Sequence, residues 1–130
     1  QAKELLAKFG VPVPAGFAPT DAAVLDGHRL LILNRKFDGV SVEAAITLVD
    51  LAPVQAGGDA ATMRLLARWG VGSPWPVDNM EGLTLVREGG RLLLYVVSDN
   101  NFNPAQRTIL LRLEPVTPLP DQERLDDPFL

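Results

Sequence analysis

The sequence predicts an all-β protein of antiparallel meander sheets, about two propeller-like blades, with a short N-terminal helix. Short apolar runs alternate with turns, and the 130 residues include 11 glycines and 11 prolines. This pattern is typical of small strands joined by tight connections. The two halves also resemble each other, since each has a short strand, a turn with glycine, a strongly apolar strand ending in polar residues, and a further strand. Repeated up-and-down sheets of about four strands are the sequence form of propeller blades.

Three segments follow from these patterns. Apolar residues at helical spacing predict a helix over residues 1–10, and the two prolines that follow impose an extended path. We therefore expect a helix and linker over 1–16, a propeller-like β domain over 17–118, and a C-terminal tail over 119–130.

The first blade is expected over residues 21–69 and the second over 81–116. Strands are predicted at 21–25, 29–34, 43–51, 81–87, 91–98 and 108–116, with 53–58 as an exit loop and 62–69 as either a strand or a short helix. The second blade then has only three strands. Such a blade exposes an edge that another strand must cover.

Composition excludes several classes of function. Sixteen acidic and twelve basic residues give a net charge of −4. No nucleic-acid partner is expected, because binding to a nucleic-acid backbone requires a basic face. The absence of cysteine excludes disulfides and thiolate chemistry. No apolar run reaches the length of a membrane helix, so no membrane insertion is expected, and no signal-like segment is present. His28 is the single histidine, and Ser41, Ser73 and Ser98 lie in no G-x-S-x-G motif, which argues against a serine hydrolase.

Two resemblances accompany these patterns. The stretches "TDAAVLDGHRLLILNRKF", "VDNMEGLTL" and "YVVSDNNFNPAQRTILLRLE" resemble the C-terminal part of the phytase-like esterase family, over about residues 16–118. The resemblance implies a β-propeller, a small phosphoester or ester substrate, and a periplasmic or secreted location. Typical members are much longer. Residues 1–16 resemble instead the N-terminal start of the succinate–CoA ligase β subunit, without its nucleotide-binding or CoA-binding parts.

Glu81 is the first candidate for chemistry. It opens the innermost strand of the second blade, which in a propeller lines a central channel. The following glycine lets the backbone approach a ligand closely, and the pair resembles the metal- or substrate-facing glutamate of several propeller hydrolases. Asp78 and Asn79 precede it, and the alternative is a surface turn in which these two bond local amides.

The stretch "SDNNFNPAQR" gathers oxygen ligands after an apolar strand. Asp99, Asn100 and Asn101 together with Glu81 are predicted to hold calcium, which takes six to eight oxygens. The family resemblance makes calcium plausible. The alternative is an Asx-rich turn that caps strand ends, and both interpretations can hold for different members of the run.

Arg35 and Arg107 end or follow corresponding strands in the two halves. Arginine suits bidentate capture of phosphate or carboxylate, so both are predicted to bind substrate, with Gln106 as a weaker companion. The alternative is a salt bridge to Asp99 or Glu81, or an exposed strand end.

Two functions follow. In the first, the chain is a calcium-assisted phosphoester or ester hydrolase in which Glu81 is a metal ligand or general base. In the second, it is a non-catalytic propeller fragment that acts as an assembly or binding module. Identical copies would then pair through exposed strand edges, and three copies would give six blades.

Overall fold

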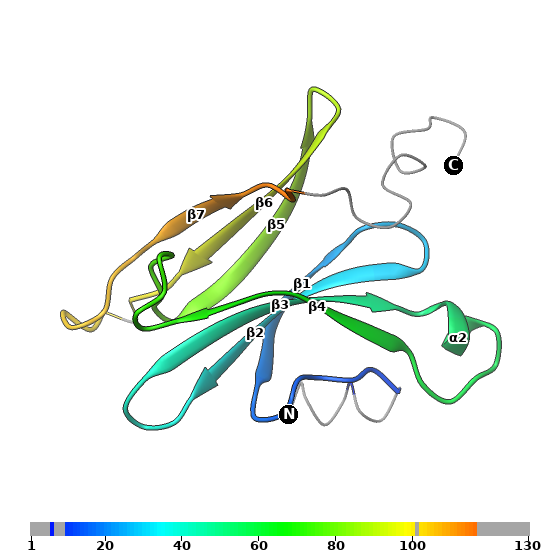
Figure 1. Cartoon of the computed structure of the whole chain (residues 1–130), viewed down its shortest axis with the longest axis horizontal. Coiled ribbons are helices and arrows are strands. Elements are labelled where there is room, and N and C mark those ends of the chain that lie inside the picture. Colours follow the sequence, from blue (N-terminus) through cyan, green and yellow to red (C-terminus); the bar gives the residue numbers. More distant parts are fainter. Residues whose placement is uncertain (1–5, 7–9, 101, 117–130) are drawn as a thin grey trace.

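The computed structural model describes residue 6, residues 10–100 and residues 102–116. Two antiparallel sheets form two layers, one above the other in Figure 1. The strands are β1 (Ala18–Val24), β2 (Arg29–Phe37), β3 (Val42–Asp50), β4 (Thr62–Gly70), β5 (Met80–Glu88), β6 (Arg91–Ser98) and β7 (Leu110–Leu113), with the short helix α2 (Ala52–Gln55) after β3. The all-β class with two meander sheets is confirmed.

Each sheet is a simple meander, ordered β1-β2-β3-β4 and β5-β6-β7. The segment that allowed either a strand or a helix is the strand β4, which pairs along β3. Helix α2 occupies the first part of the segment that was expected to be an exit loop. Pro53 lies in its first turn, where a backbone N–H has no acceptor within the helix, so proline is tolerated there. Strand β7 is shorter than predicted. Expectations for residues 1–5, 7–9 and 117–130 lie outside the described residues.

The main core lies between the two sheets. Alternate residues of β2, such as Leu31 and Leu33, pack there with Leu94 and Val96 of β6. Each side chain of this kind contributes about 1.5–3 kcal/mol when it is fully buried. Trp69 joins the same cluster and donates from Nε1 to the carbonyl oxygen of Pro76 at 3.1 Å. The core therefore holds the two sheets as one unit.

The outer face of the first sheet is covered by the segment that precedes β1. Val11 packs against Ile32 and Val49, and the N–H of Ala61 donates to the carbonyl of Gly10 at 2.7 Å. Phe17 is buried, with the Arg68 guanidinium 5.2 Å from its ring centroid. The chain thus covers this face with its own residues.

The first strands of the two sheets meet. Thr20 Oγ1 donates to the carbonyl of Met80 at 3.1 Å, and the N–H of Leu83 donates to Asp21 Oδ2 at 2.8 Å. Farther along, Arg87 donates to the carbonyl of Leu25 at 2.9 Å. These bonds fix β1 against β5, and thereby fix the start of β5, where Glu81 lies. Among the described residues, no helix is long and apolar enough to cross a membrane.

Candidate functional site

Three connections meet at one end of the molecule, at the left in Figure 1: the β2–β3 hairpin, the β4–β5 loop and the β6–β7 loop. Together they line a cavity of about 530 Å³, which we call the hairpin cavity. Its lining residues are Arg35, Phe37, Val40, Ser41, Val42, Val71, Val77, Asp78, Asn79, Asn103, Ala105 and Gln106. Two of the three predicted substrate-binding residues, Arg35 and Gln106, therefore share one cavity.

Arg35 reaches this end because of its position on β2. Leu31 and Leu33 lie in the core between the sheets, and side chains two residues apart share a face of a strand. Arg35 continues that face at the rim of the core, where its side chain is 36% exposed. Its guanidinium donates to Asn79 Oδ1 and forms an ion pair of 3.8 Å with Glu81. The salt bridge considered as an alternative for Arg35 is therefore present.

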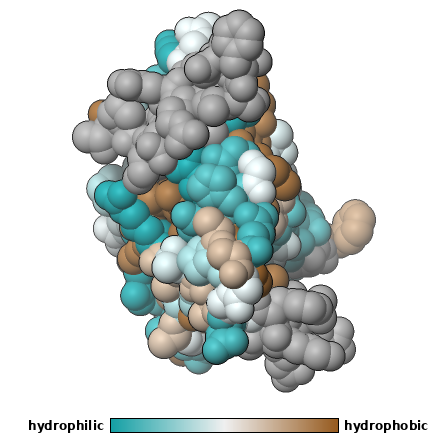
Figure 2. All heavy atoms as spheres, turned by 90° about the vertical axis from the view of Figure 1, so that its right-hand side faces the viewer, coloured by the Kyte–Doolittle hydropathy of each residue, from teal (hydrophilic) through white to brown (hydrophobic). Residues whose placement is uncertain are grey.

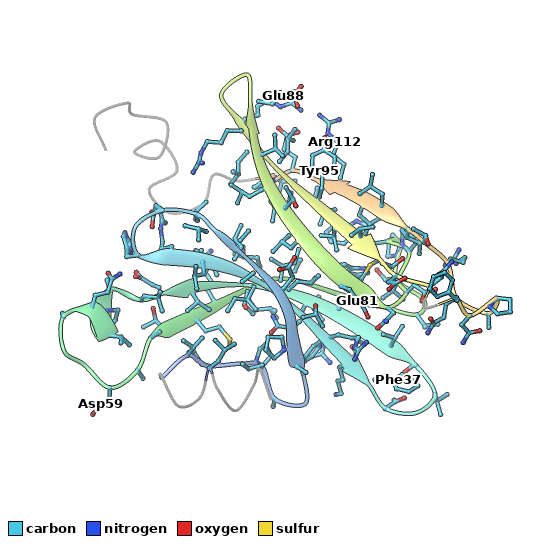
Figure 3. All side chains as sticks on the ribbon, turned by 180° about the vertical axis from the view of Figure 1, so that it is seen from behind. Phe37, Asp59, Glu81, Glu88, Tyr95 and Arg112 are labelled. Atoms are coloured by element: carbon cyan, nitrogen blue, oxygen red, sulfur yellow. The ribbon has the colours of Figure 1, made fainter. Side chains whose placement is uncertain are left out.

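Glu81 is placed by a β-bulge. The pairing of β5 with β6 shifts register between Met80 and Gly82, so Glu81 is the extra residue. Bulges bend a strand and re-aim a side chain, and they are frequent beside active sites. Glu81 Oε1 accepts a hydrogen bond from Asn79 Nδ2 at 2.6 Å, and its side chain is 40% exposed. Figure 3 shows Glu81 and Phe37 at the same end of the molecule. Glu81 does not itself line the cavity, but it contacts two residues that do.

Asp78 organises the backbone around the cavity. Its Oδ1 accepts from the N–H of Asn79 at 2.7 Å, and its Oδ2 accepts from the N–H of Arg107 at 2.9 Å. The carboxylate thus joins the β4–β5 loop to the end of the β6–β7 loop. Arg107 is exposed and is not among the residues that line the cavity. The predicted pair of arginines does not converge on this cavity.

The amide-rich stretch makes local turns. Asn100 Oδ1 accepts from the N–H of Phe102 at 3.0 Å, and Asn103 Oδ1 accepts from the N–H of Ala105 at 2.9 Å. Ser98 Oγ accepts from the N–H of Ile109 and donates to the carbonyl of Arg107, both at 2.7 Å. The turn interpretation therefore holds for Asn100 and Asn103. Asn101 lies outside the described residues.

The comparisons with known proteins now bear on this geometry. A family model, Phytase-like, described as esterase-like activity of phytase, matches residues 1–102. The chain belongs to the phytase-like family. The matched range includes β1 to β6, Arg35 and Glu81, and it supports a phytase-like or esterase-like hydrolase domain in general. Searches of curated proteins and of solved structures found no match. None of the comparisons bears on the likeness of residues 1–16 to succinate–CoA ligase.

The predicted calcium ligands of this phytase-like domain are only partly brought together. The N–H of Asp99 donates to the carbonyl of Asn79 at 3.0 Å, so its backbone adjoins the segment that carries Glu81. Asn100 Oδ1 already accepts a backbone bond, and Glu81 is paired with a guanidinium. Within the described ranges, no three histidine, cysteine, aspartate or glutamate side chains form a group able to hold a metal. As arranged, the described donors do not form a complete calcium site, and Glu81 would have to leave Arg35 to join one, so we derive no step through calcium.

Sequence reasoning missed the apolar part of the hairpin cavity. Phe37, Val40 and Val71 are all more than half exposed and belong to two different connections. The available signal was weak, because single exposed apolar residues are normal on protein surfaces. Only the fold brings the three to one cavity. Asn79 was noticed solely as a neighbour of Glu81, although it contacts both charged partners.

A second polar cluster lies at the opposite end of the phytase-like domain, around the β1–β2 turn. His28 Nδ1 lies 2.8 Å from Asp50 Oδ1, and Asp26 accepts from Arg29 Nε at 2.9 Å. The hydrogen bond with His28 lowers the pKa of Asp50 most, and the hydrogen bond from the N–H of Ala52 lowers it further. Burial raises the pKa of Asp26, but the N–H of His28 and the bonds with Arg29 lower it more. Figure 2 views this end, where hydrophilic residues cover much of the visible centre. The cluster fixes a turn far from the hairpin cavity.

Proposed function

We propose that this phytase-like domain hydrolyses a phosphoester or carboxylic ester at the hairpin cavity. The observation that carries the proposal is the Arg35–Asn79–Glu81 group, in which a cation and a carboxylate from different sheets are joined through one amide at the cavity wall. Family membership supports a hydrolase in general. The contacts among these three side chains support the hairpin cavity as the place of the proposed reaction.

The proposed chemistry assigns one task to each residue. Arg35 binds the anionic or polarised oxygen of the substrate and stabilises the charge that develops there. Glu81 acts as general base and takes a proton from a water molecule, whose oxygen then bonds to the phosphorus or carbonyl carbon. The bond to the leaving oxygen breaks, and that oxygen takes up the proton that Glu81 accepted, which returns Glu81 to its ionised form. Asn79 positions the two side chains relative to each other, because it accepts a hydrogen bond from Arg35 and donates one to Glu81.

Hydrolysis of p-nitrophenyl phosphate and p-nitrophenyl acetate tests this proposal. Arg35→Gln and Glu81→Gln should each reduce kcat/KM by about 10²-fold, a usual size for loss of an oxyanion partner or a general base. Arg112→Gln and Glu88→Gln are matched controls, because both side chains are exposed, do not line the cavity, and lie away from Phe37 and Glu81 in Figure 3. Equal activity in Glu81→Gln and Glu88→Gln would remove the general base from the scheme.

Calcium assistance belongs to the same test. The family resemblance implies calcium, and Asp99 and Glu81 are the carboxylates we propose for it. Calcium would have to displace Arg35 from Glu81. Because a ligand that binds the folded protein stabilises it, the melting temperature should rise when calcium is added and fall again when a chelator is added. Activity and melting that are indifferent to both additions would leave a metal-independent hydrolase.

The second candidate function is an assembly module. Strands β4 and β7 end their sheets, and Leu65 on β4 and Leu110 on β7 are at least half exposed. An open strand edge with apolar side chains can pair with another copy. Light scattering in solution tests this candidate: a concentration-independent monomer would contradict it, whereas a closed multimer without hydrolytic activity would favour it over the enzyme.

A further inference from the structure

The lining of the hairpin cavity combines polar and apolar side chains. The polar ones are Arg35, Asp78, Asn79, Asn103 and Gln106, and the apolar ones are Phe37, Val40, Val42, Val71 and Val77. Cavities that bind small ligands commonly combine an apolar wall with a few polar groups that fix orientation. This combination determines which ligands fit.

The charge of the cavity suits a ligand with a single anionic head group. Among its described lining residues Arg35 is the one cation, and that cation is partly balanced by Glu81 at 3.8 Å. Asp78 adds a negative charge, although both its oxygens accept backbone N–H groups. A ligand with several phosphates brings a large negative charge that one arginine does not neutralise, and burying unpaired charge is costly.

The apolar wall suits an aromatic or aliphatic group. Phe37 is 67% exposed, Val40 93% and Val71 76%, and all three line the same cavity. Exposed apolar side chains that gather in one place, rimmed by polar groups, mark a binding surface. Figure 3 shows Phe37 on the β2–β3 hairpin, at the end of the molecule where Glu81 lies.

We infer that the hairpin cavity selects esters or phosphoesters with one anionic or polarised head group and a bulky apolar substituent, and discriminates against polyphosphates. The head group binds at Arg35, and the substituent lies on the wall formed by Phe37, Val40 and Val71. This inference rests on the proposed function for its placement in the reaction, but it concerns binding and is measured without turnover.

Calorimetric titration with three non-hydrolysed ligands tests the inference at physiological salt. Phenylphosphonate should bind about tenfold more tightly than methylphosphonate, because the ring removes further apolar surface from water. Inositol hexakisphosphate should bind no more tightly than methylphosphonate. Equal affinity for phenylphosphonate and methylphosphonate, stronger binding of the hexakisphosphate, or no binding of any ligand would each overturn the inference.

Two double variants separate the apolar wall from general surface effects. Phe37→Ser with Val40→Ser should abolish the preference for the phenyl ligand and leave methylphosphonate binding unchanged. Val24→Ser with Leu110→Ser removes two residues of 68% and 65% exposure outside the cavity and should leave the preference intact. All four side chains are exposed, so both proteins should fold, which circular dichroism checks.

The outcomes also separate this inference from the proposed function. Turnover of p-nitrophenyl esters without a phenyl preference in binding would overturn the inference alone. A phenyl preference that depends on Phe37 and Val40, without turnover of any ester, would overturn the proposed hydrolysis and leave the binding site in place.

Discussion

Thr20 and Glu81 hold the same place in the two sheets, because each is the extra residue of a β-bulge in the first strand of its sheet. In β1 the register shifts between Pro19 and Asp21, and in β5 it shifts between Met80 and Gly82. Thr20 uses its hydroxyl to bond the backbone of β5, whereas Glu81 carries its carboxylate to the site. The bulge in β1 therefore contributes to the junction between the sheets, whereas the bulge in β5 contributes to the candidate site.

The junction predicts the first measurable effect. Asp21→Ala removes the acceptor for the N–H of Leu83, a buried residue, and leaves that donor unsatisfied. The free energy of unfolding should fall by about 1–3 kcal/mol in urea titrations. Asp59→Ala is the control, because its side chain is exposed and points outward in Figure 3. Similar losses in both proteins would show that the inter-sheet bond contributes nothing.

The fold was predictable wherever strand pattern and turn chemistry agree. The β5–β6 hairpin follows from two apolar runs that flank Gly89 and Gly90, both of positive φ. Strand β4 was ambiguous because the apolar and polar residues of 62–69 do not alternate cleanly, and in the structure its first four residues are all exposed. The bulge at Glu81 left no signature, since an extra residue looks like any other until the partner strand is known.

The candidate site was only partly predictable for a different reason. Arg35 and Asn79 are 44 residues apart, and their contact depends on how the sheets pack. Residue chemistry alone marked Arg35, Gln106 and Glu81 as useful. It could not tell that Arg107 would lie outside the cavity lining while Gln106 lies within it. Which side chains converge is a property of the junction between the sheets.

Gly10, in the segment before β1, and Gly57, in the β3–β4 connection, should differ in how much stability is lost when each is replaced by alanine. A Cβ on Gly10, whose φ is +73°, would lie 2.2 Å from the backbone oxygen of Asp59. Gly57 has a φ of +95° and open space around it. Gly57→Ala should cost about 1–2 kcal/mol for the left-handed backbone alone. Gly10→Ala should cost about 1–3 kcal/mol more, because the backbone must also move. Thermal unfolding compares the two, and equal melting temperatures would contradict the predicted clash.

A buried amide in the first sheet predicts a pH-dependent defect. Asn34 is fully buried, and its Nδ2 donates to the carbonyls of Ile32 and Ala45 and to Thr47 Oγ1, at 3.2–3.3 Å. Asn34→Asp replaces these donors with a carboxyl whose pKa burial raises. A raised pKa in the folded state gives stability at low pH that is lost as pH rises. The loss relative to wild type should therefore be about 3–5 kcal/mol at pH 7 and smaller at pH 4.

Asn103→Asp provides the matched comparison for this prediction. Asn103 is exposed, and its Oδ1 accepts a single backbone bond that a carboxylate can also accept. Its stability should change little at either pH. A loss for Asn34→Asp that is the same at pH 7 and pH 4 would show that the charge is not the cause.

The His28–Asp50 contact predicts part of the acid sensitivity. The pKa of Asp50 is lowered in the folded protein, chiefly by its bond with His28. A lowered pKa gives stability that is present above the ordinary value of 3.8 and is lost as pH falls through the folded value. Wild type should therefore lose more stability between pH 5 and pH 2 than Asp50→Asn does. Urea unfolding at several pH values measures this, with Asp59→Asn as the exposed control; parallel curves for wild type and Asp50→Asn would contradict it.

The amide between the two charged groups predicts how the proposed reaction fails. Asn79→Ala removes the side chain that contacts both Arg35 and Glu81, while the backbone bond from Asp99 to its carbonyl is retained. Misplacing reacting groups by about 1 Å can cost about 10²-fold in rate, so kcat should fall by about 10- to 100-fold with a smaller change in KM. Asn103→Ala also alters the cavity lining, but nothing in the described contacts joins its side chain to Arg35 or Glu81, so its kcat should stay near that of wild type. Equal losses in the two variants would mean that Asn79 merely shapes the cavity, whereas a selective loss of kcat would place the amide in the positioning of base and cation.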